Sequence, residues 1–398
     1  MPRTGEWERK SGRSRESTRL RRELVDRLER CGWIETAAVR RAFLALPREC
    51  FLAEVAEREG LARVYEDTAI FTASDERGVP TSSSSPPSLM ASMLERLSLR
   101  PGQRVLEIGA GTGCNAALLA KLVGARGQVV SVELDPVTAR RARRGLARAG
   151  SPASVVRGDG REGWRRGAPY DRIIATASAS SVAPAWHEQL RDGGLLELPL
   201  RISRSGGQAV VTLRKHGHVL RSEALLQGGF MPLRDVPGGP APPAPPTLSA
   251  SEHVDGRSRP LAHLSGAALC GLSAASRQRL LSQALSEPRT RPLGMRALSA
   301  ELGFYLMVET PGDRFVLVVG WPHRPGVISK DAEGRALLSG GLKTLTRIES
   351  RGAGDAERVL RRLVERWKHL GRPTMDDLQI EVTFDASGDS RVELTWGD

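Results

Sequence analysis

The clearest candidate for chemistry is a glycine-rich turn at residues 107–113 (EIGAGTG), which follows an apolar run. Glycines let a backbone turn tightly and approach a ligand closely. Glu133 ends the next apolar run, 20 residues after Gly113, where a carboxylate can accept hydrogen bonds from both hydroxyls of a ribose. Asp159 and Gly160 end a third run, where an acid and an approachable backbone can hold an adenine amine. Together they predict a nucleoside site at the carboxyl edge of a parallel sheet.

The spacing of the turn separates two classes of nucleoside ligand. It reads GxGxG, whereas a dinucleotide-binding turn reads GxGxxG. An acid, Glu107, comes before the first glycine, and its charge suits the cationic sulfonium and amino end of S-adenosyl-L-methionine better than a pyrophosphate. We therefore predict this methyl donor as the cofactor. The predicted donor-binding residues are Glu107, Ile108, Gly109, Gly111, Thr112, Gly113, Glu133, Leu134, Asp159 and Gly160.

No metal site is predicted. The four cysteines, at positions 31, 50, 114 and 270, are far apart and form no CxxC pair. This spacing excludes a conventional zinc finger and favours free, structural thiols. The seven histidines show no HxxxH grouping.

Strands and helices alternate around the candidate residues, which predicts an α/β fold with a doubly wound, mostly parallel sheet. A hairpin over residues 208–225 is expected to extend that sheet. The expected strands cover 104–108, 127–135, 154–160, 170–178 and 194–200, and the expected helices cover 115–122, 136–149 and 187–194.

The chain of 398 residues is long enough for two cores. We predict a disordered basic tail over 1–18, a methyltransferase domain over 19–235, a proline-rich linker over 236–251 and a smaller α+β domain over 252–398. In the last of these, FYLMVE (304–309), RFVLVVGW (314–321), LQIEVTF (378–384) and RVELTW (391–396) resemble strands, and residues 356–367 form an amphipathic helix.

The formal net charge is +13. Such a charge is typical either of an arginine-biased base composition or of an acidic partner, a nucleic acid or an acidic peptide. No apolar run reaches the roughly 18 residues of a membrane helix, and the N-terminus has no apolar signal region. We therefore expect a cytoplasmic protein with no membrane partner.

The segment from about Leu24 to Arg234 resembles the protein-L-isoaspartate O-methyltransferase family. The resemblance implies a Rossmann-like class I methyltransferase fold that uses S-adenosyl-L-methionine. The motifs that carry it are LPRECF (46–51), YED (65–67), VLEIGAGTG (105–113), VE (132–133), GDG (158–160), GW (163–164), PYDRI (169–173) and FMPL (230–233).

The family's substrate motif, a Thr-Ile-Ser-Gln-Pro-like segment, is altered in this chain. Alignment on Ala91 and Met93 places Ser83, Ser84 and Ser85 over its Thr-Ile-Ser part, with Ser85 on the active-site serine and Pro86 in place of the glutamine. Hydroxyls and backbone amides there would cradle a carboxylate. The alternative interpretation is a serine-rich loop that merely caps the next helix.

The altered motif and the C-terminal extension resemble methyltransferases of ribosomal peptide natural-product pathways. The main hypothesis is therefore methylation of an aspartate in a precursor peptide, whose ester collapses to aspartimide or isoaspartate. The alternatives are repair of isoaspartyl residues in damaged proteins and, from the charge, RNA methylation. Nucleic acid is not the expected partner, since no RNA-recognition motif is found, and a non-catalytic scaffold is disfavoured because every donor position is intact.

Overall fold

The structure, a computed structural model, describes residues 15–397 except 77, 204–206, 235–246, 255–256, 266–268, 270–271, 286, 312–313, 319–323, 330–333, 341–343 and 353. The chain divides into two compact units. The first comprises Met1–Leu200, Val210–Pro242 and Glu381–Glu393, and the second comprises Arg201–Ala209, Pro243–Ile380 and Leu394–Asp398.

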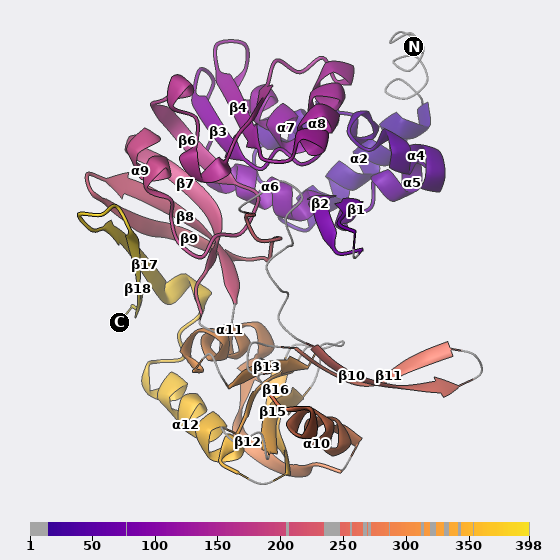
Figure 1. Cartoon of the computed structure of the whole chain (residues 1–398), viewed down its shortest axis with the longest axis vertical. Coiled ribbons are helices and arrows are strands. Elements are labelled where there is room, and N and C mark those ends of the chain that lie inside the picture. The colour runs from indigo at the N-terminus through magenta and orange to yellow at the C-terminus, as the bar shows by residue number, and fades with distance from the viewer. Residues whose placement is uncertain are drawn as a thin grey trace. The chain divides into compact units, whose positions relative to one another are not determined.

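The first unit is built on a sheet in which the order β5-β4-β3-β6-β7 is parallel throughout (Figure 1). The predicted α/β class is confirmed. Successive residues of the central strand, among them Val105 and Leu106, are fully buried. Helices cover both faces of such a sheet, so its strands do not alternate between apolar and polar residues. The parallel strands are β3 (Arg104–Ile108), β4 (Gln128–Glu133), β5 (Ser154–Arg157), β6 (Tyr170–Ala175) and β7 (Leu190–Arg201).

Helices connect these strands close to where the sequence predicts them. The first turn of α8 is capped by Asp135, whose side chain accepts from Thr138 N, and Thr36 caps α3 in the same way through Val39 N. The predicted helix 187–194 ends earlier, because residues from Leu190 onward are extended. The helices are α2 (Arg15–Arg30), α3 (Ala37–Ala45), α4 (Ala53–Glu59), α5 (Leu61–Val64), α6 (Pro87–Arg96), α7 (Cys114–Val123), α8 (Pro136–Arg148) and α9 (Pro184–Gln189), with 3-10 turns η1 (Arg48–Cys50) and η2 (Gly160–Glu162).

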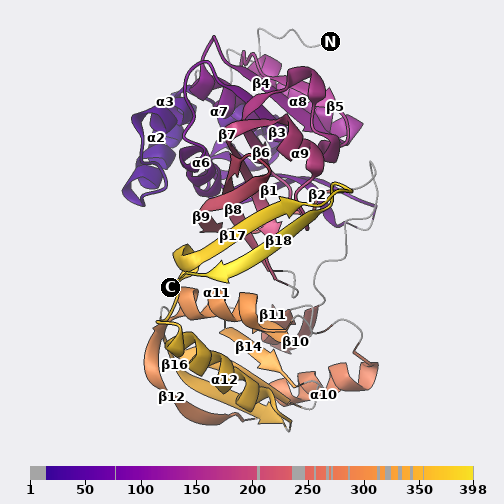
Figure 2. The same ribbon diagram turned by 90° about the vertical axis from the view of Figure 1, so that its left-hand side faces the viewer.

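The predicted hairpin forms from β8 (Gln208–His216) and β9 (Val219–Gln227). Two further strands extend it in the order β18-β17-β9-β8, namely β17 (Leu378–Phe384), which lies next to β9, and β18 (Ser390–Trp396), which lies outside β17 (Figure 2). β17 pairs antiparallel with β9 through Glu381 opposite Arg221 and Val382 opposite Leu220. Glu381–Glu393 group with the first unit, although the predicted C-terminal domain, 252–398, includes them.

A small hairpin that the sequence did not reveal carries the serine-rich segment. Its strands are β1 (Ile70–Ser74) and β2 (Pro80–Ser84), paired antiparallel with Phe71 opposite Ser83. The serine run is thus a strand of a hairpin rather than a cap.

The predicted tail and linker are corrected in part. Residues 1–14 and 235–246 lie outside the described residues. Residues 15–18 belong to α2, where the buried Ser17 hydroxyl donates to Glu49. Residues 247–251 belong to β10 (Thr247–Val254).

The second unit is α+β, with a sheet in the order β10-β11-β13-β14-β15-β16-β12. The segment 304–309, predicted as a strand, is instead part of helix α11, because Leu302, Tyr305 and Leu306 recur at helical spacing and are buried in the core. The predicted helix over 356–367 is confirmed as α12. The remaining elements are β11 (Arg257–Ser265), α10 (Ala274–Leu285), β12 (Arg289–Leu298), α11 (Ser299–Glu309), β13 (Phe315–Val318), β14 (Arg324–Ile328), β15 (Gly334–Gly340), β16 (Thr344–Gly352), α12 (Ala356–His369) and the 3-10 turn η5 (Met375–Asp377).

In the part of the chain that the structure describes, no helix is both long enough and apolar enough to cross a membrane.

Candidate active site

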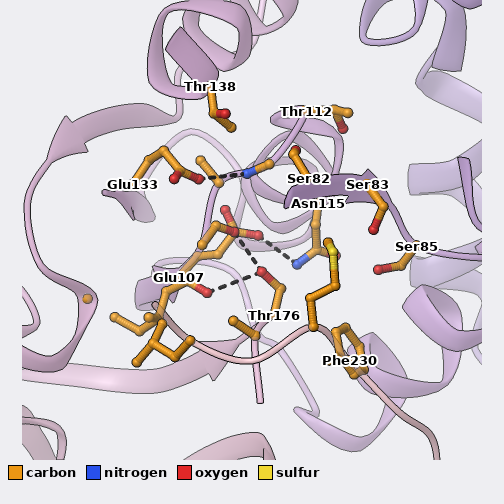
Figure 3. A pocket seen from close by; sticks show the side chains of 18 of the residues that line it. Ser82, Ser83, Ser85, Glu107, Thr112, Asn115, Glu133, Thr138, Thr176 and Phe230 are labelled. Atoms are coloured by element: carbon orange, nitrogen blue, oxygen red, sulfur yellow. Dashed lines mark hydrogen bonds between the residues drawn. The ribbon is translucent and has the colours of Figure 1, made fainter. Parts of the chain in front are cut away.

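An open pocket of about 1100 Å³, including the solvent at its mouth, lies at the carboxyl ends of β3, β4 and β6. One wall comes from the glycine-rich turn and the strand ends, and the facing wall comes from the serine segment (Figure 3). This is the edge at which parallel sheets bind ligands. The lining includes Thr81, Ser82, Ser83, Ser84, Ser85, Glu107, Ile108, Gly109, Gly111, Thr112, Asn115, Glu133, Leu134, Asp135, Thr138, Gly160, Thr176 and the segment 230–234.

The turn after β3 needs its glycines. Gly109, Gly111 and Gly113 have φ values of 92°, 51° and 87°, a region that other residues adopt only with strain. A Cβ on Gly113 would lie 3.0 Å from the carbonyl oxygen of Ala142. The turn therefore packs directly against α8, and its backbone faces the pocket.

Glu107 is fully buried at the base of the pocket. Its Oε1 accepts from Asn115 Nδ2 at 2.8 Å, and its Oε2 accepts from the Ser131 hydroxyl. Burial raises the pKa of Glu107 to about 7, although these two hydrogen bonds favour the charged form. A cation entering the pocket would favour the carboxylate, so Glu107 is suited to bind a positively charged ligand.

Glu133 ends β4 and faces the glycine turn. Its Oε2 accepts from Gly111 N at 3.2 Å and its Oε1 accepts from Asp135 N at 3.0 Å. Burial raises its pKa as well. The carboxylate thus lies between the turn and the next loop.

The serines of the facing wall divide by alternation along β2. Ser82 and Ser84 are buried: Ser82 Oγ accepts from Thr72 Oγ1 at 3.0 Å, and Ser84 Oγ accepts from Arg48 Nη2 at 3.2 Å. Ser83 and Ser85 lie together on the wall across from Glu107 and Glu133 (Figure 3). The hydroxyls of Ser83 and Ser85, which can donate hydrogen bonds, therefore face the residues predicted to bind S-adenosyl-L-methionine.

A family model described as Protein-L-isoaspartate(D-aspartate) O-methyltransferase matches residues 19–237. The chain belongs to this family. It is an S-adenosyl-L-methionine-dependent methyltransferase, as the sequence predicted.

Relatives named Protein-L-isoaspartate O-methyltransferase show how far the likeness extends. That of Pyrobaculum neutrophilum is 37% identical over 214 residues, which are 53% of this chain and 98% of the relative. That of Thermotoga maritima is 38% identical over 194 residues, 48% of this chain and 60% of the relative. A solved structure of the same name shares the fold, with a TM-score of 0.52 and 24% identity over 94% of this chain and 99% of that one.

The solved structure bears on the C-terminal extension. Because it covers 94% of this chain, its likeness continues well beyond the family segment that ends at residue 237. A chain named protein-L-isoaspartate O-methyltransferase thus shares the extended architecture. The extension does not by itself mark a peptide-modifying form of the protein-L-isoaspartate O-methyltransferase family.

Most of the site residues predicted from the sequence line the same pocket in the structure. The pocket is lined by eight of the ten predicted donor residues and by the three predicted serines: Glu107, Ile108, Gly109, Gly111, Thr112, Glu133, Leu134, Gly160, Ser83, Ser84 and Ser85. Two predicted residues do not line the pocket, Gly113, which ends the turn, and Asp159. Asp159 accepts from Arg161 N at 2.9 Å and pairs with Arg161 Nη2 at 2.6 Å. Its contact with an adenine stays a prediction.

Sequence reasoning missed several lining residues. Asn115 orients Glu107, and Thr176 donates through Oγ1 to Gly109 O at 2.6 Å and so supports the turn. Thr176 directly follows β6, and Asn115 is the second residue of α7. Their positions after a strand and after a glycine turn were the available signal. Among the described residues, no group of three potential metal ligands is found.

Proposed function

We propose that this protein transfers a methyl group to the free α-carboxylate of isoaspartyl residues in proteins or peptides. The observation that carries the proposal is the pair of facing walls, with buried acids and a glycine turn on one side and the hydroxyls of Ser83 and Ser85 on the other. Membership of the family supports the same acceptor.

The residues present fit the methyl donor. Gly109, Gly111 and Gly113 let the backbone approach it, Glu133 can take the two ribose hydroxyls, and Glu107 can stabilise its positive charge. When bound, S-adenosyl-L-methionine supplies an electrophilic methyl group: a carboxylate oxygen bonds the methyl carbon, and the sulfonium sulfur leaves as a neutral thioether.

The acceptor requires no general base. An α-carboxylate has an ordinary pKa of about 3.3–3.7 and an aspartate side chain one near 3.9, so either is already ionised at neutral pH. The task of the protein is to hold the carboxylate in line, and well-oriented reactants gain roughly 7–11 kcal/mol in this way. We assign this positioning to Ser83 and Ser85, whose hydroxyls can donate to the two carboxylate oxygens, with Ser84 fixing the strand through Arg48.

A second acceptor is favoured by one specific observation. The serine run, with Pro86 after Ser85, departs from the family's substrate motif, and such a change at the acceptor wall suits an altered acceptor. The candidate is an ordinary aspartate in a ribosomally made precursor peptide. After methylation, the following backbone nitrogen would attack the ester carbonyl, expel methanol and leave an aspartimide that water can open to isoaspartate.

Three synthetic peptides of one sequence test the proposal. They carry isoaspartate, aspartate or alanine at the same position and are incubated with the full-length chain and S-adenosyl-L-methionine. Mass spectrometry is expected to show a gain of one methylene mass on the isoaspartyl peptide alone. Methylation of the aspartyl peptide alone would move the assignment to the second acceptor. A loss of water relative to the starting peptide would mark the aspartimide that follows methylation. An unchanged mass for all three, with no S-adenosyl-L-homocysteine formed, would refute both.

A further inference from the structure

A second, open hollow of about 520 Å³, including the solvent at its mouth, is lined by β1 of the serine hairpin together with α4 and α8. We name it the arginine groove, because Arg58, Arg141, Arg144 and Arg148 line it against a single acid, Glu54. Four guanidinium groups around one carboxylate leave a formal excess of positive charge. The groove is therefore suited to an anionic ligand.

The spacing of α8 explains why its arginines face the groove. Arg141, Arg144 and Arg148 are three and four residues apart, which places them on one face of a helix. Gly145 allows this face to approach the groove floor, because a Cβ there would lie 2.7 Å from Phe51 Cδ1. The arrangement is built into the packing of α8 against η1.

The charges of the groove are only partly neutralised. Arg141 Nη2 lies 3.2 Å from Glu54 Oε2, and Arg58 Nη2 lies 2.6 Å from Glu59 Oε1. Arg148 Nη1 donates to Cys50 O at 3.3 Å. Arg144 is exposed and has no acidic partner among the residues that the structure describes. It is the cation most available to an incoming anion.

The arginine groove is joined to the acceptor wall through the serine hairpin. Arg141 Nη1 donates to Thr72 O at 2.5 Å, and Thr72 Oγ1 donates to Ser82 Oγ at 3.0 Å. Phe71, which lines the groove and is 58% exposed, pairs across the hairpin with Ser83. One strand of the hairpin thus lines the methylation pocket and the other lines the groove.

We infer that the arginine groove binds acidic side chains of the polypeptide substrate, close to the residue that is methylated. This inference rests on the proposed function. Adjacent strands lie about 4.8 Å apart and an extended peptide advances about 3.3 Å per residue. A peptide whose carboxylate reaches Ser83 and Ser85, and which runs across the hairpin, would carry its residues two to four positions away over the groove, where Phe71 offers them an apolar rim.

Two isoaspartyl peptides test the inference with the full-length chain. They differ only in carrying glutamates or glutamines two to four residues from the isoaspartate. The glutamate peptide is expected to have the lower KM. In Arg144→Glu its KM should rise about fivefold or more, the size of a lost and reversed surface ion pair, while kcat and the KM of the glutamine peptide stay unchanged. Raising the salt concentration should shrink the difference.

Arg126→Glu is the matched control. Arg126 is also exposed, but it precedes β4 at the opposite end of the strand from the pocket. The same change of net charge there should leave both KM values unaltered. If the two variants have equal effects, the preference comes from the net charge of the protein and not from the groove, and the inference is wrong. Equal KM values of the two peptides in the unaltered protein would also overturn it.

Fluorescence anisotropy of the labelled peptides separates this inference from the proposed function. Suppose that neither peptide is methylated while the glutamate peptide still binds more tightly and Arg144→Glu abolishes this preference. In that case the proposed function is refuted, and binding of acidic side chains in the arginine groove is supported. If an RNA oligonucleotide of equal length binds more tightly than the glutamate peptide and only its affinity falls in Arg144→Glu, the groove is a nucleic-acid site and the inference is wrong.

Discussion

The two walls of the methylation pocket are built by different means. The donor wall, formed by the glycine turn and Glu133, stands on the ends of parallel strands whose central strand, β3, is buried from Val105 to Ile108. Its turn is fixed by left-handed glycines. The acceptor wall stands on a two-stranded hairpin whose register is interrupted near Ala73. The strand ends hold the donor-binding residues in one fixed geometry, whereas side chains of the hairpin can be substituted without disturbing the core. If the proposed function is right, a substitution in the hairpin can change the carboxylate acceptor without changing the donor site.

The largest expected effect belongs to the donor wall. Gly113→Ala should lower donor affinity about 100-fold, because the turn must move away from the carbonyl of Ala142 and small displacements of binding groups are costly. It should also destabilise the fold by about 1–2 kcal/mol, the penalty for a left-handed alanine. Calorimetric titration and urea unfolding measure the two effects.

Gly124→Ala provides the control for backbone strain. Gly124 has a φ of 66°, but a Cβ there would meet nothing within 4 Å. Gly124→Ala should lower the free energy of unfolding by about as much as Gly113→Ala does and should leave the affinity for the methyl donor unchanged. If both variants bind the donor equally well, the donor wall is not as rigid as the comparison requires.

The acceptor wall should respond in a different measurement. Ser85→Ala should lower kcat/KM for an isoaspartyl peptide about tenfold, the value of one hydrogen bond to a charged group, and Ser83→Ala should act alike. Donor affinity should not change. Ser88→Ala, three residues along and outside the pocket lining, is the matched control, and a loss of donor affinity in Ser85→Ala would contradict the division into two walls.

The smallest expected effect is a pH dependence of donor binding. The pKa of Glu107 is about 7 in the free protein, and a bound cation lowers it, so binding requires loss of a proton below that pH. Affinity should therefore fall about fivefold from pH 7 to pH 6. Glu107→Gln should bind more weakly and show no such slope, and a slope that persists in this variant would assign the proton to another group.

The sequence indicated most of the residues that line the pocket, but it did not reveal the hairpin that carries the serines, for a physical reason. Glycine spacing and acids at strand ends are local signals, so Glu107, Gly111 and Glu133 were found before the fold was seen. The hairpin that carries Ser83 was not, because its strands are short and its polar run lacks the apolar alternation of a strand.

Long-range packing also escaped the sequence. The strands β17 and β18 were recognised, yet their pairing with β9 depends on tertiary contacts that no local pattern encodes. The arginine stripe of α8 could be seen in the sequence, but Phe71 and Glu54, which complete the groove, come from distant segments. Asp159 shows the opposite case, since a local signal predicted a pocket residue and the structure pairs it with Arg161 instead.

Titration calorimetry of the full-length chain with S-adenosyl-L-methionine tests the central claim most directly. We expect one donor bound per chain, and binding at least about tenfold weaker in Glu133→Gln, which keeps the side chain's shape but removes the charge that accepts from the ribose hydroxyls. Absence of donor binding to the folded protein, or equal affinity in Glu133→Gln, would contradict the account.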